Sequence, residues 1–385
     1  MRQARTWIAA LLGTMIAALP VQAAEQEAPE LYNPARHVFV AGTAIPNIAV
    51  VDIDKGEQID TLKIPVAAKV FAASTDSHYL AFSDRVDRAV YTLNVKDRAV
   101  KRYPLPSTVY RIIFIPNSSK ILLVLFENIA VLDVASGKVD VIERKFQSLY
   151  TRYNIIFSVY SRTVWVTQEN TPLIHRYNLN KPQEGWSDID IGDTRGFGMG
   201  APSFEDKVIA FNTYYADEGI IYFNDTGKVI KTGKMHNSRS LNQPMVEPYV
   251  DNGTKNVIFG DKRGNLKIYR LDEGDEPFEY QISFPPNRFR TGWMDQYLIV
   301  SGDEAIGIYP FDNMDKGTVI TFGYEENVND VWVSGDSKYL LFGTARSNKL
   351  GVFDLQKQKR LPDIQLSGIA EVGRIRMNTA NTVCY

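Results

Sequence analysis

The chain has 385 residues, with 43 Lys and Arg against 45 Asp and Glu, and its formal net charge is −2. This balance provides no basic surplus for binding a nucleic-acid backbone, and the chain contains no polybasic run for a membrane surface. The only cysteine, Cys384, cannot form an internal disulfide, so the fold must be stabilised by packing alone.

The first residues have the pattern of a secretory signal peptide. Arg2 and Arg5 precede a short apolar stretch at residues 8–19, and residues 21–23 form a small-residue cleavage site. The apolar stretch is too short and wrongly flanked for a membrane span. We therefore expect residues 1–23 to be cleaved and residues 24–35 to form an N-terminal extension. The mature protein is expected in the periplasm, without integral membrane association.

One pattern then recurs along the chain: an apolar run that ends in Asp or Asn. The eight copies end at Asp52, Asn94, Asp133, Asn178, Asn224, Asp272, Asp312 and Asp354. Their spacings are 42, 39, 45, 46, 48, 40 and 42 residues. Eight copies at this period predict a repeat architecture.

Each copy contains four short β-rich segments separated by turn residues. Residues 331–343, VWVSGDSKYLLFG, illustrate an innermost strand, a turn and a second strand. We expect Gly335 and Asp336 to give this turn its backbone shape. We also expect the Asp or Asn that ends each third strand to hydrogen-bond to the following turn. Four antiparallel strands per repeat predict an all-β, single eight-bladed β-propeller, with seven or nine blades as the alternatives.

The two ends of the repeat region predict how the ring closes. The first copy, at residues 36–42, has no innermost strand before it, whereas residues 371–385 contain a lone one. We therefore predict a propeller over residues 36–385, with its first blade completed by residues 371–385. Closure removes two open sheet edges.

Ligands of propellers bind at the axial mouth, where the innermost strands begin. Counting back from each second strand places Lys69, Arg111 and Arg374 in register, and Arg152 one residue off. The remaining blades contribute Arg195, Glu247, Arg288 and Asn329 nearby. Converging cations attract anions, and Arg suits bidentate binding of carboxylate or phosphate. The hypothesis is a site for an anion at Lys69, Arg111, Arg152, Arg195, Arg288 and Arg374. The alternative is that these residues lie at blade edges and bond to neighbouring carbonyl groups.

Two other segments are weaker candidates. The glycines in RGFGMG, residues 195–200, could let the backbone approach a ligand closely, or they could allow close packing near the axis. The polar stretch at residues 236–244 contains the loop candidates His236, Arg239 and Asn242, with a solvated loop as the alternative.

Catalytic motifs are missing from the sequence. It contains no GxSxG, HExxH, P-loop or CxxC, and His37, His78 and His175 are not spaced as metal ligands. We therefore expect a non-catalytic protein and assign no metal or cofactor from these motifs.

Residues 47–65 and 129–142 resemble the YVTN-type repeats of bacterial β-propellers. That superfamily includes the large subunits of periplasmic amine dehydrogenases and the haem-d domain of periplasmic nitrite reductase with its biosynthetic relatives. The tail RIRMNTANTVCY is similar to the Asn-Thr-rich tail of the haem-d domain, and HNSRSLN is similar to its His-x-x-Arg-x-x-Asn loop. This resemblance would place His236 beside a tetrapyrrole, with Lys69, Arg111 and Arg374 facing its carboxylates.

The chain departs from the haem-d pattern at functional positions. Lys69 stands where that family has its axial histidine, Glu247 corresponds roughly to a second distal histidine, and no CxxCH is present. Nitrite reduction is therefore not expected. The sequence favours a binding or scaffold protein of a periplasmic redox system, whose partner is a protein or a small anion. The alternatives are a haem-d-like tetrapyrrole carrier or biosynthetic factor, and the propeller subunit of an amine-dehydrogenase-type complex.

Overall fold

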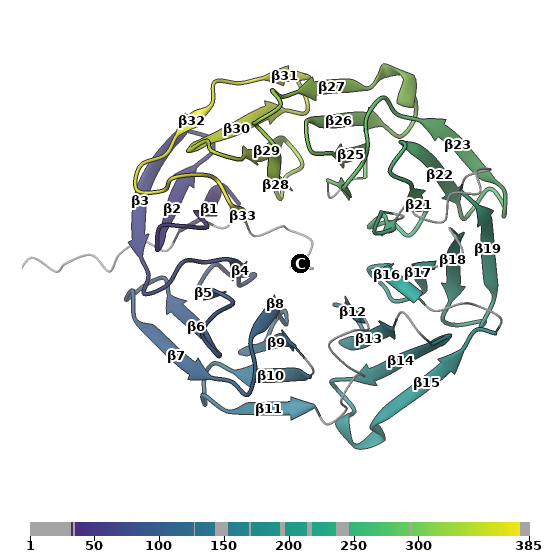
Figure 1. Ribbon diagram of the computed structural model, residues 1–385, viewed down its shortest axis with the longest axis horizontal. Helices are drawn as coiled ribbons and strands as arrows, with labels where there is room; N and C mark the ends of the chain where they lie inside the picture. The colour runs from purple at the N-terminus through teal and green to yellow at the C-terminus, as the bar shows by residue number, and fades with distance from the viewer. Residues whose placement is uncertain are drawn as a thin grey trace, which may run out of the picture. The chain divides into compact units, whose positions relative to one another are not determined.

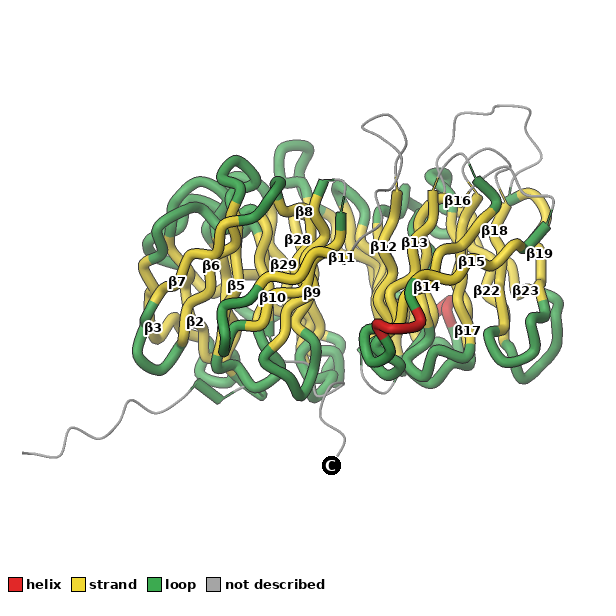
Figure 2. The backbone as a smooth tube through the Cα atoms, turned by 90° about the horizontal axis from the view of Figure 1, so that it is seen from below, coloured by secondary structure: helices red, strands yellow, loops and turns green. Residues whose placement is uncertain are grey.

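The computed structural model describes residues 32–33, 35–126, 128–142, 153–168, 171–192, 197–213, 218–235, 246–292 and 295–377. In these residues eight antiparallel β-sheets surround a central axis as the blades of a propeller (Figure 1). Viewed from the side, the sheets stand next to one another, with loops at both flat faces (Figure 2). This arrangement confirms the predicted all-β, eight-bladed propeller. The alternative counts of seven and nine blades are wrong.

The strands of each blade run from the axis outward. The first four blades consist of β33 (Arg374–Arg376), β1 (His37–Ala41), β2 (Asn47–Asp52), β3 (Glu57–Lys63); β4 (Val70–Ala73), β5 (Tyr79–Ser83), β6 (Ala89–Asn94), β7 (Val100–Pro104); β8 (Val109–Phe114), β9 (Lys120–Leu125), β10 (Ile129–Asp133), β11 (Val139–Ile142); β12 (Tyr153–Ser158), β13 (Thr163–Gln168), β14 (Leu173–Asn178) and β15 (Trp186–Asp190).

The other four blades follow the same order. They consist of β16 (Phe197–Pro202), β17 (Val208–Thr213), β18 (Glu218–Phe223), β19 (Val229–Lys234); β20 (Tyr249–Val250), β21 (Asn256–Gly260), β22 (Asn265–Arg270), β23 (Pro277–Gln281); β24 (Arg288–Thr291), β25 (Tyr297–Ser301), β26 (Ala305–Pro310), β27 (Thr318–Thr321); β28 (Val328–Val333), β29 (Tyr339–Thr344), β30 (Lys349–Asp354), β31 (Lys359–Arg360) and β32 (Ile364–Gln365). The described helical segments are two short 3₁₀ turns, η1 (Pro182–Glu184) and η2 (Met314–Lys316). No described helix has the length and apolar character needed to cross a bilayer.

The C-terminal strand closes the ring, as the sequence predicted. β33 pairs with β1 through Phe39 with Arg376, Val40 with Ile375, and Ala41 with Arg374. Ile375 is fully buried in a core cluster shared by the first and last blades. The fold therefore joins the two ends of the repeat region in one sheet. Residues 378–385, including Cys384, lie outside the described residues.

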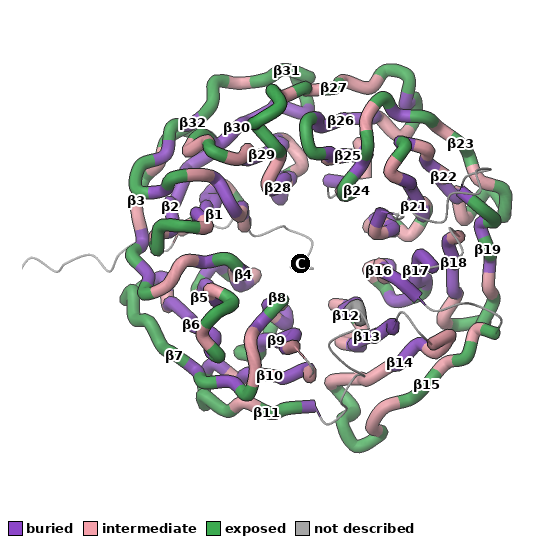
Figure 3. The backbone as a smooth tube through the Cα atoms, in the orientation of Figure 1, coloured by how far each residue is buried: buried purple, intermediate pink, exposed green. Residues whose placement is uncertain are grey.

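The hydrophobic core lies between neighbouring blades. All five residues of β1 are buried, whereas outer strands such as β7 are mostly exposed (Figure 3). An inner blade strand has a neighbouring blade on each side, so both of its faces are apolar. This explains why runs such as HVFVA lack the alternation of a half-buried strand.

The Asp and Asn residues at the ends of third strands cap turns in five blades. Asp52 Oδ1, for example, accepts hydrogen bonds from the amides of Asp54 and Lys55, both at 3.1 Å. Equivalent bonds form at Asn94, Asp133, Asn178 and Asp354. The prediction is wrong for Asn224, Asp272 and Asp312, because β18, β22 and β26 end one or two residues before them. There the side chain comes too late in the turn.

The turn in residues 331–343 differs from the prediction at one residue. Gly335 is not the residue with left-handed backbone, because φ is +57° at Ser337 instead. Asp336 does shape the turn, since its Oδ1 accepts the amide of Lys338 at 3.0 Å and the hydroxyl of Ser334 at 2.5 Å.

Candidate functional site: the axial cavity

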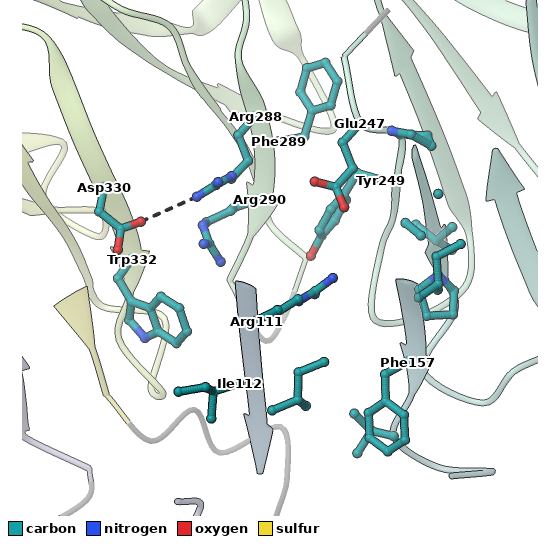
Figure 4. Close-up of a pocket in the computed structure, with 18 of the residues that line it drawn as sticks. Arg111, Ile112, Phe157, Glu247, Tyr249, Arg288, Phe289, Arg290, Asp330 and Trp332 are labelled. Carbon is teal, nitrogen blue, oxygen red and sulfur yellow. Dashed lines mark ion pairs between the residues drawn. The ribbon is translucent and has the colours of Figure 1, made fainter. Parts of the chain in front are cut away.

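The innermost strands of all eight blades surround a cavity of 730 Å³ on the propeller axis. Lys69, Arg111, Arg288 and Arg374, four of the six predicted site residues, line it. Lys69 directly precedes β4, Arg288 and Arg374 are the first residues of β24 and β33, and Arg111 is the third residue of β8. Figure 4 shows Arg111 and Arg288 directed into the same space. Arg152, Arg195, His236, Arg239 and Asn242 lie outside the described residues.

Blade eight contributes Asp330 to the cavity instead of the predicted Asn329. A register shift between Val328 and Asp330 disturbs the start of β28, so the count from the second strand misses by one residue. The side-chain amide of Asn329 instead donates a hydrogen bond to the carbonyl oxygen of Val372 at 3.1 Å.

Sequence reasoning also missed a second layer of cavity residues. Alternate residues of a strand share a face, so the residue two positions after each predicted one was a candidate. This rule finds Arg290 after Arg288, Arg376 after Arg374 and Tyr249 after Glu247, all of which line the cavity. Trp332 also lines the cavity, but it lies two positions after Asp330 and cannot be found from the predicted Asn329. Arg85, on the turn between β5 and β6, has no such signal.

Cationic side chains outnumber carboxylates in the lining of the cavity. The described lining contains seven cationic side chains, Lys69, Arg85, Arg111, Arg288, Arg290, Arg374 and Arg376. It contains three carboxylates, Glu247, Asp251 and Asp330. The cavity thus carries a positive excess in a chain whose formal net charge is −2.

Asp330, in blade eight, organises the arginines of the two neighbouring blades. Its Oδ2 lies 2.7 Å from Arg376 Nη1 and accepts the amide of Ile375 at 3.0 Å. Its Oδ1 lies 3.5 Å from Arg288 Nη1, the ion pair drawn in Figure 4. Burial raises the pKa of this carboxyl, but Arg376, Arg290 and the Ile375 amide outweigh burial and hold the pKa below its usual value. Asp330 is therefore a buried anion that fixes its neighbouring cations.

Trp332 provides an aromatic surface for two of these cations. The guanidinium carbons of Arg290 and Arg376 lie 4.8 and 5.1 Å from its ring centre, within cation–π range. Burial, followed by repulsion from Arg288, lowers the pKa of Arg290 to about 10, so Arg290 stays charged at neutral pH. The Nε atom of Arg290 is buried without a hydrogen-bond partner among the described residues.

Arg111 and Arg374 keep donors available to a ligand. Arg111 Nη1 donates to the carbonyl oxygen of Ile155, and Arg374 Nη1 to that of Gly373, both at 2.9 Å. These bonds agree in part with the alternative that blade-edge cations bond to carbonyl groups. However, a guanidinium has five N–H donors, so one such bond leaves most of its capacity unused.

The glycines of residues 195–200 that the structure describes pack closely. A Cβ atom on Gly200 would lie 2.4 Å from Ile156 Cδ1 and 2.8 Å from the carbonyl oxygen of Ala210. One on Gly198 would lie 2.3 Å from Asn212 Oδ1. This crowding favours the packing interpretation of these glycines.

Two of the histidines considered as metal ligands contact other residues of their own blades or of the segment before them. His37 accepts the amide of Asn33 at 2.7 Å and lies 3.5 Å from Asp52 Oδ2, while His175 contacts Asp188 at 2.9 Å. Within the described ranges, His, Cys, Asp and Glu form no group of three that could hold a metal ion.

Comparison with known proteins identifies the fold. No family model and no curated protein sequence matches the chain. The solved structure of the dihydro-heme d1 dehydrogenase NirN in complex with DHE is similar, with a TM-score of 0.69 and 13% identity over 91% of this chain and 77% of that one. Two structures of AztD from Citrobacter koseri, one of them apo, match with TM-scores of 0.64 and 0.61 and 12% identity over 88% of this chain and 96% of theirs. These similarities confirm the propeller fold that the resemblance to distant bacterial β-propellers implied.

Proposed function

We propose that the protein is an exported, non-catalytic β-propeller that binds an anionic ligand in its axial cavity and acts as an accessory protein of a periplasmic redox system. The observation that carries this proposal is the excess of seven cationic side chains over three carboxylates around one cavity. An excess of one charge held within low-dielectric walls attracts and concentrates the opposite charge.

The size and chemistry of the cavity agree with a small ligand. Its 730 Å³ lies within the range of about 300–1,000 Å³ that small-molecule sites occupy. Arg111 and Arg374 offer planar donor groups, which suit bidentate contacts to carboxylate or phosphate. Charges fixed on several blades recognise a ligand without any movement of the ring.

Isothermal titration calorimetry of the purified protein with phosphate, pyrophosphate, citrate and succinate tests the proposal. We expect at least one anion to bind, and Arg111→Gln and Arg374→Gln each to weaken it about tenfold or more, because each removes a charge-assisted contact. Lys101→Gln, on the exposed outer strand β7, is the matched control and should bind as the wild type does. Binding that all three variants lose equally, or no binding at all, would refute the axial site.

A tetrapyrrole is the second candidate ligand. Trp332, Phe157 and Ile112 add aromatic and apolar surface to the cavity, and a similar structure was solved in complex with DHE. The visible spectrum of the protein from its native periplasm tests this. A Soret-type band that Lys69→Ala or His236→Ala abolishes would support a tetrapyrrole.

A scaffold role would give a different result in that experiment. A colourless protein that co-purifies with a stoichiometric partner would count against the tetrapyrrole. If that partner carried a redox cofactor, the subunit of an amine-dehydrogenase-type complex would be favoured.

A further inference from the structure

The three carboxylates of the cavity lining differ in their partners. Asp330 contacts Arg376 and Arg288, as described above. Asp251 Oδ1 accepts the amides of Lys255 and Asn256 at 2.7 and 3.0 Å, so this side chain holds its own turn. Glu247, in contrast, has no hydrogen bond or ion pair to any residue that the structure describes.

Glu247 is fixed by its backbone at the wall of the cavity. The amide of Val246, the preceding residue, donates to the carbonyl oxygen of Gly260 at 2.9 Å, and β20 begins two residues later. The side chain is half-buried, and Figure 4 shows its carboxylate directed toward the space that Arg111 and Arg290 also face. Burial lowers the pKa of Arg111, the negative charge of Glu247 opposes this effect, and Arg288 adds to it.

The hydroxyl of Tyr249 does not hydrogen-bond to Glu247. It lies 2.9 Å from Thr291 Oγ1, whose hydroxyl in turn donates to Asp295 Oδ1 at 2.6 Å. Tyr249 therefore belongs to a polar network between blades six and seven. None of the described residues uses the acceptor capacity of the Glu247 carboxylate, which we take to be available to molecules that enter the cavity.

A carboxylate that lies among cations and has no partner in the described part of the chain restricts which anions can bind. An anion made only of acceptor oxygens would bond to the arginines but place oxygen against oxygen at Glu247. An anion that also carries an ammonium or hydroxyl group would satisfy both the arginines and Glu247.

We infer that Glu247 is a specificity residue that selects anions with a hydrogen-bond donor, that is, amino- or hydroxycarboxylates. This inference rests on the proposed function, because it assumes that an anion enters the axial cavity. Glu247 would bond to the donor of the ligand, while Arg111 and the arginines around Asp330 bond to its carboxylates.

Succinate, malate and aspartate provide a direct test, because they share a four-carbon dicarboxylate skeleton and differ at one carbon. Calorimetry of the wild type should give malate or aspartate a dissociation constant about tenfold or more below that of succinate. In Glu247→Gln this preference should fall to about threefold or less, while succinate binds more tightly because a repelling charge is gone. Glu304→Gln, on the exposed turn between β25 and β26, removes the same charge at the surface and should preserve the preference.

The outcomes separate this inference from the proposed function. Equal tightening of all three acids in Glu247→Gln would overturn it, since Glu247 would then act only as a distant charge. A wild type that prefers succinate, or that binds pyrophosphate and none of the three acids, would also overturn it but leave an anion site in place. A wild type that binds no anion would overturn both. A preference for aspartate over malate would assign an ammonium donor, and the reverse a hydroxyl donor.

Discussion

At the scale of single residues, Asp330 joins cavity cations of two neighbouring blades, Arg288 and Arg376. Its side chain is 1% exposed and contacts Arg376, whose side chain is 22% exposed. Arg376 Nε also donates to the carbonyl oxygen of Phe71 at 3.1 Å, so the ion pair links blade eight with the first two blades. Asp330 thus holds together strands that are far apart in the sequence.

Asp330→Asn should lower the free energy of unfolding by about 3 kcal/mol, because removing one partner of a buried pair leaves the other charge uncompensated. Urea denaturation of the wild type and the variant measures this difference. Asp275→Asn is the control: it breaks an exposed ion pair with Lys228 and should cost about 1 kcal/mol or less. Equal losses in the two variants would show that Asp330 contributes no more than a surface charge.

The same carboxylate predicts a dependence of stability on pH. Its pKa in the folded protein lies below the unfolded value of about 4, so its contribution is complete above that pH and is lost as the pH falls through the folded pKa. The stability difference between the wild type and Asp330→Asn should therefore shrink between about pH 5 and pH 2. Urea denaturation at several pH values checks this, and a constant difference would contradict it.

Sequence spacing locates several cations of the cavity lining but not the residues that surround them. Arg111, Arg288 and Arg374 can be found because the repeat fixes where an innermost strand begins. Asp330 was missed because a register shift in β28 cannot be read from spacing. The cation–π contacts of Trp332 depend on side-chain directions across three blades, which no local pattern records.

At the scale of secondary-structure elements, blades two and eight have the same type of turn between their first and second strands. In β4–β5, Ser74 Oγ donates to Asp76 Oδ1 and accepts the amide of Tyr79 at 2.9 Å. Ser334 makes the same two bonds between β28 and β29. Periodicity predicts that a turn occurs here, but it does not predict that Ser337 carries the positive φ.

Ser74→Ala and Ser334→Ala should each lower the free energy of unfolding by about 1–2 kcal/mol, because each leaves a backbone donor without its acceptor. The two losses should add in the double variant, since the turns lie in separate blades. Thermal or urea unfolding measures them. Ser283→Ala is the control: Ser283 lies in the exposed segment after β23 and its hydroxyl has no hydrogen bond to any described residue, so the change in stability should be about 0.5 kcal/mol or less. A similar loss in the control would contradict a special role for the shared turn.

At the scale of the whole molecule, ring closure depends on a short ladder. β33 is three residues long, yet its Ile375 packs in the core between the first and last blades, and Arg374 and Arg376 line the cavity. The repeat count and the missing innermost strand of the first copy predicted this closure. They could not show that the closing strand also contributes two cavity cations on either side of one buried residue.

Ile375→Ala and Ile308→Ala should therefore lower the free energy of unfolding equally but differ in their effect on hydrogen exchange in β1. Both side chains are fully buried, so each substitution should lower the free energy of unfolding by about 2–4 kcal/mol. Only Ile375 lies at the closing seam, whereas Ile308 lies in β26 within blade seven. Hydrogen exchange should therefore become much faster in β1 for Ile375→Ala than for Ile308→Ala at equal global stability, because the ring opens locally at its closing seam, where β33 and β1 pair through three residues. Equal exchange in β1 would mean that the ring unfolds as one unit and that β33 contributes only its share of the core.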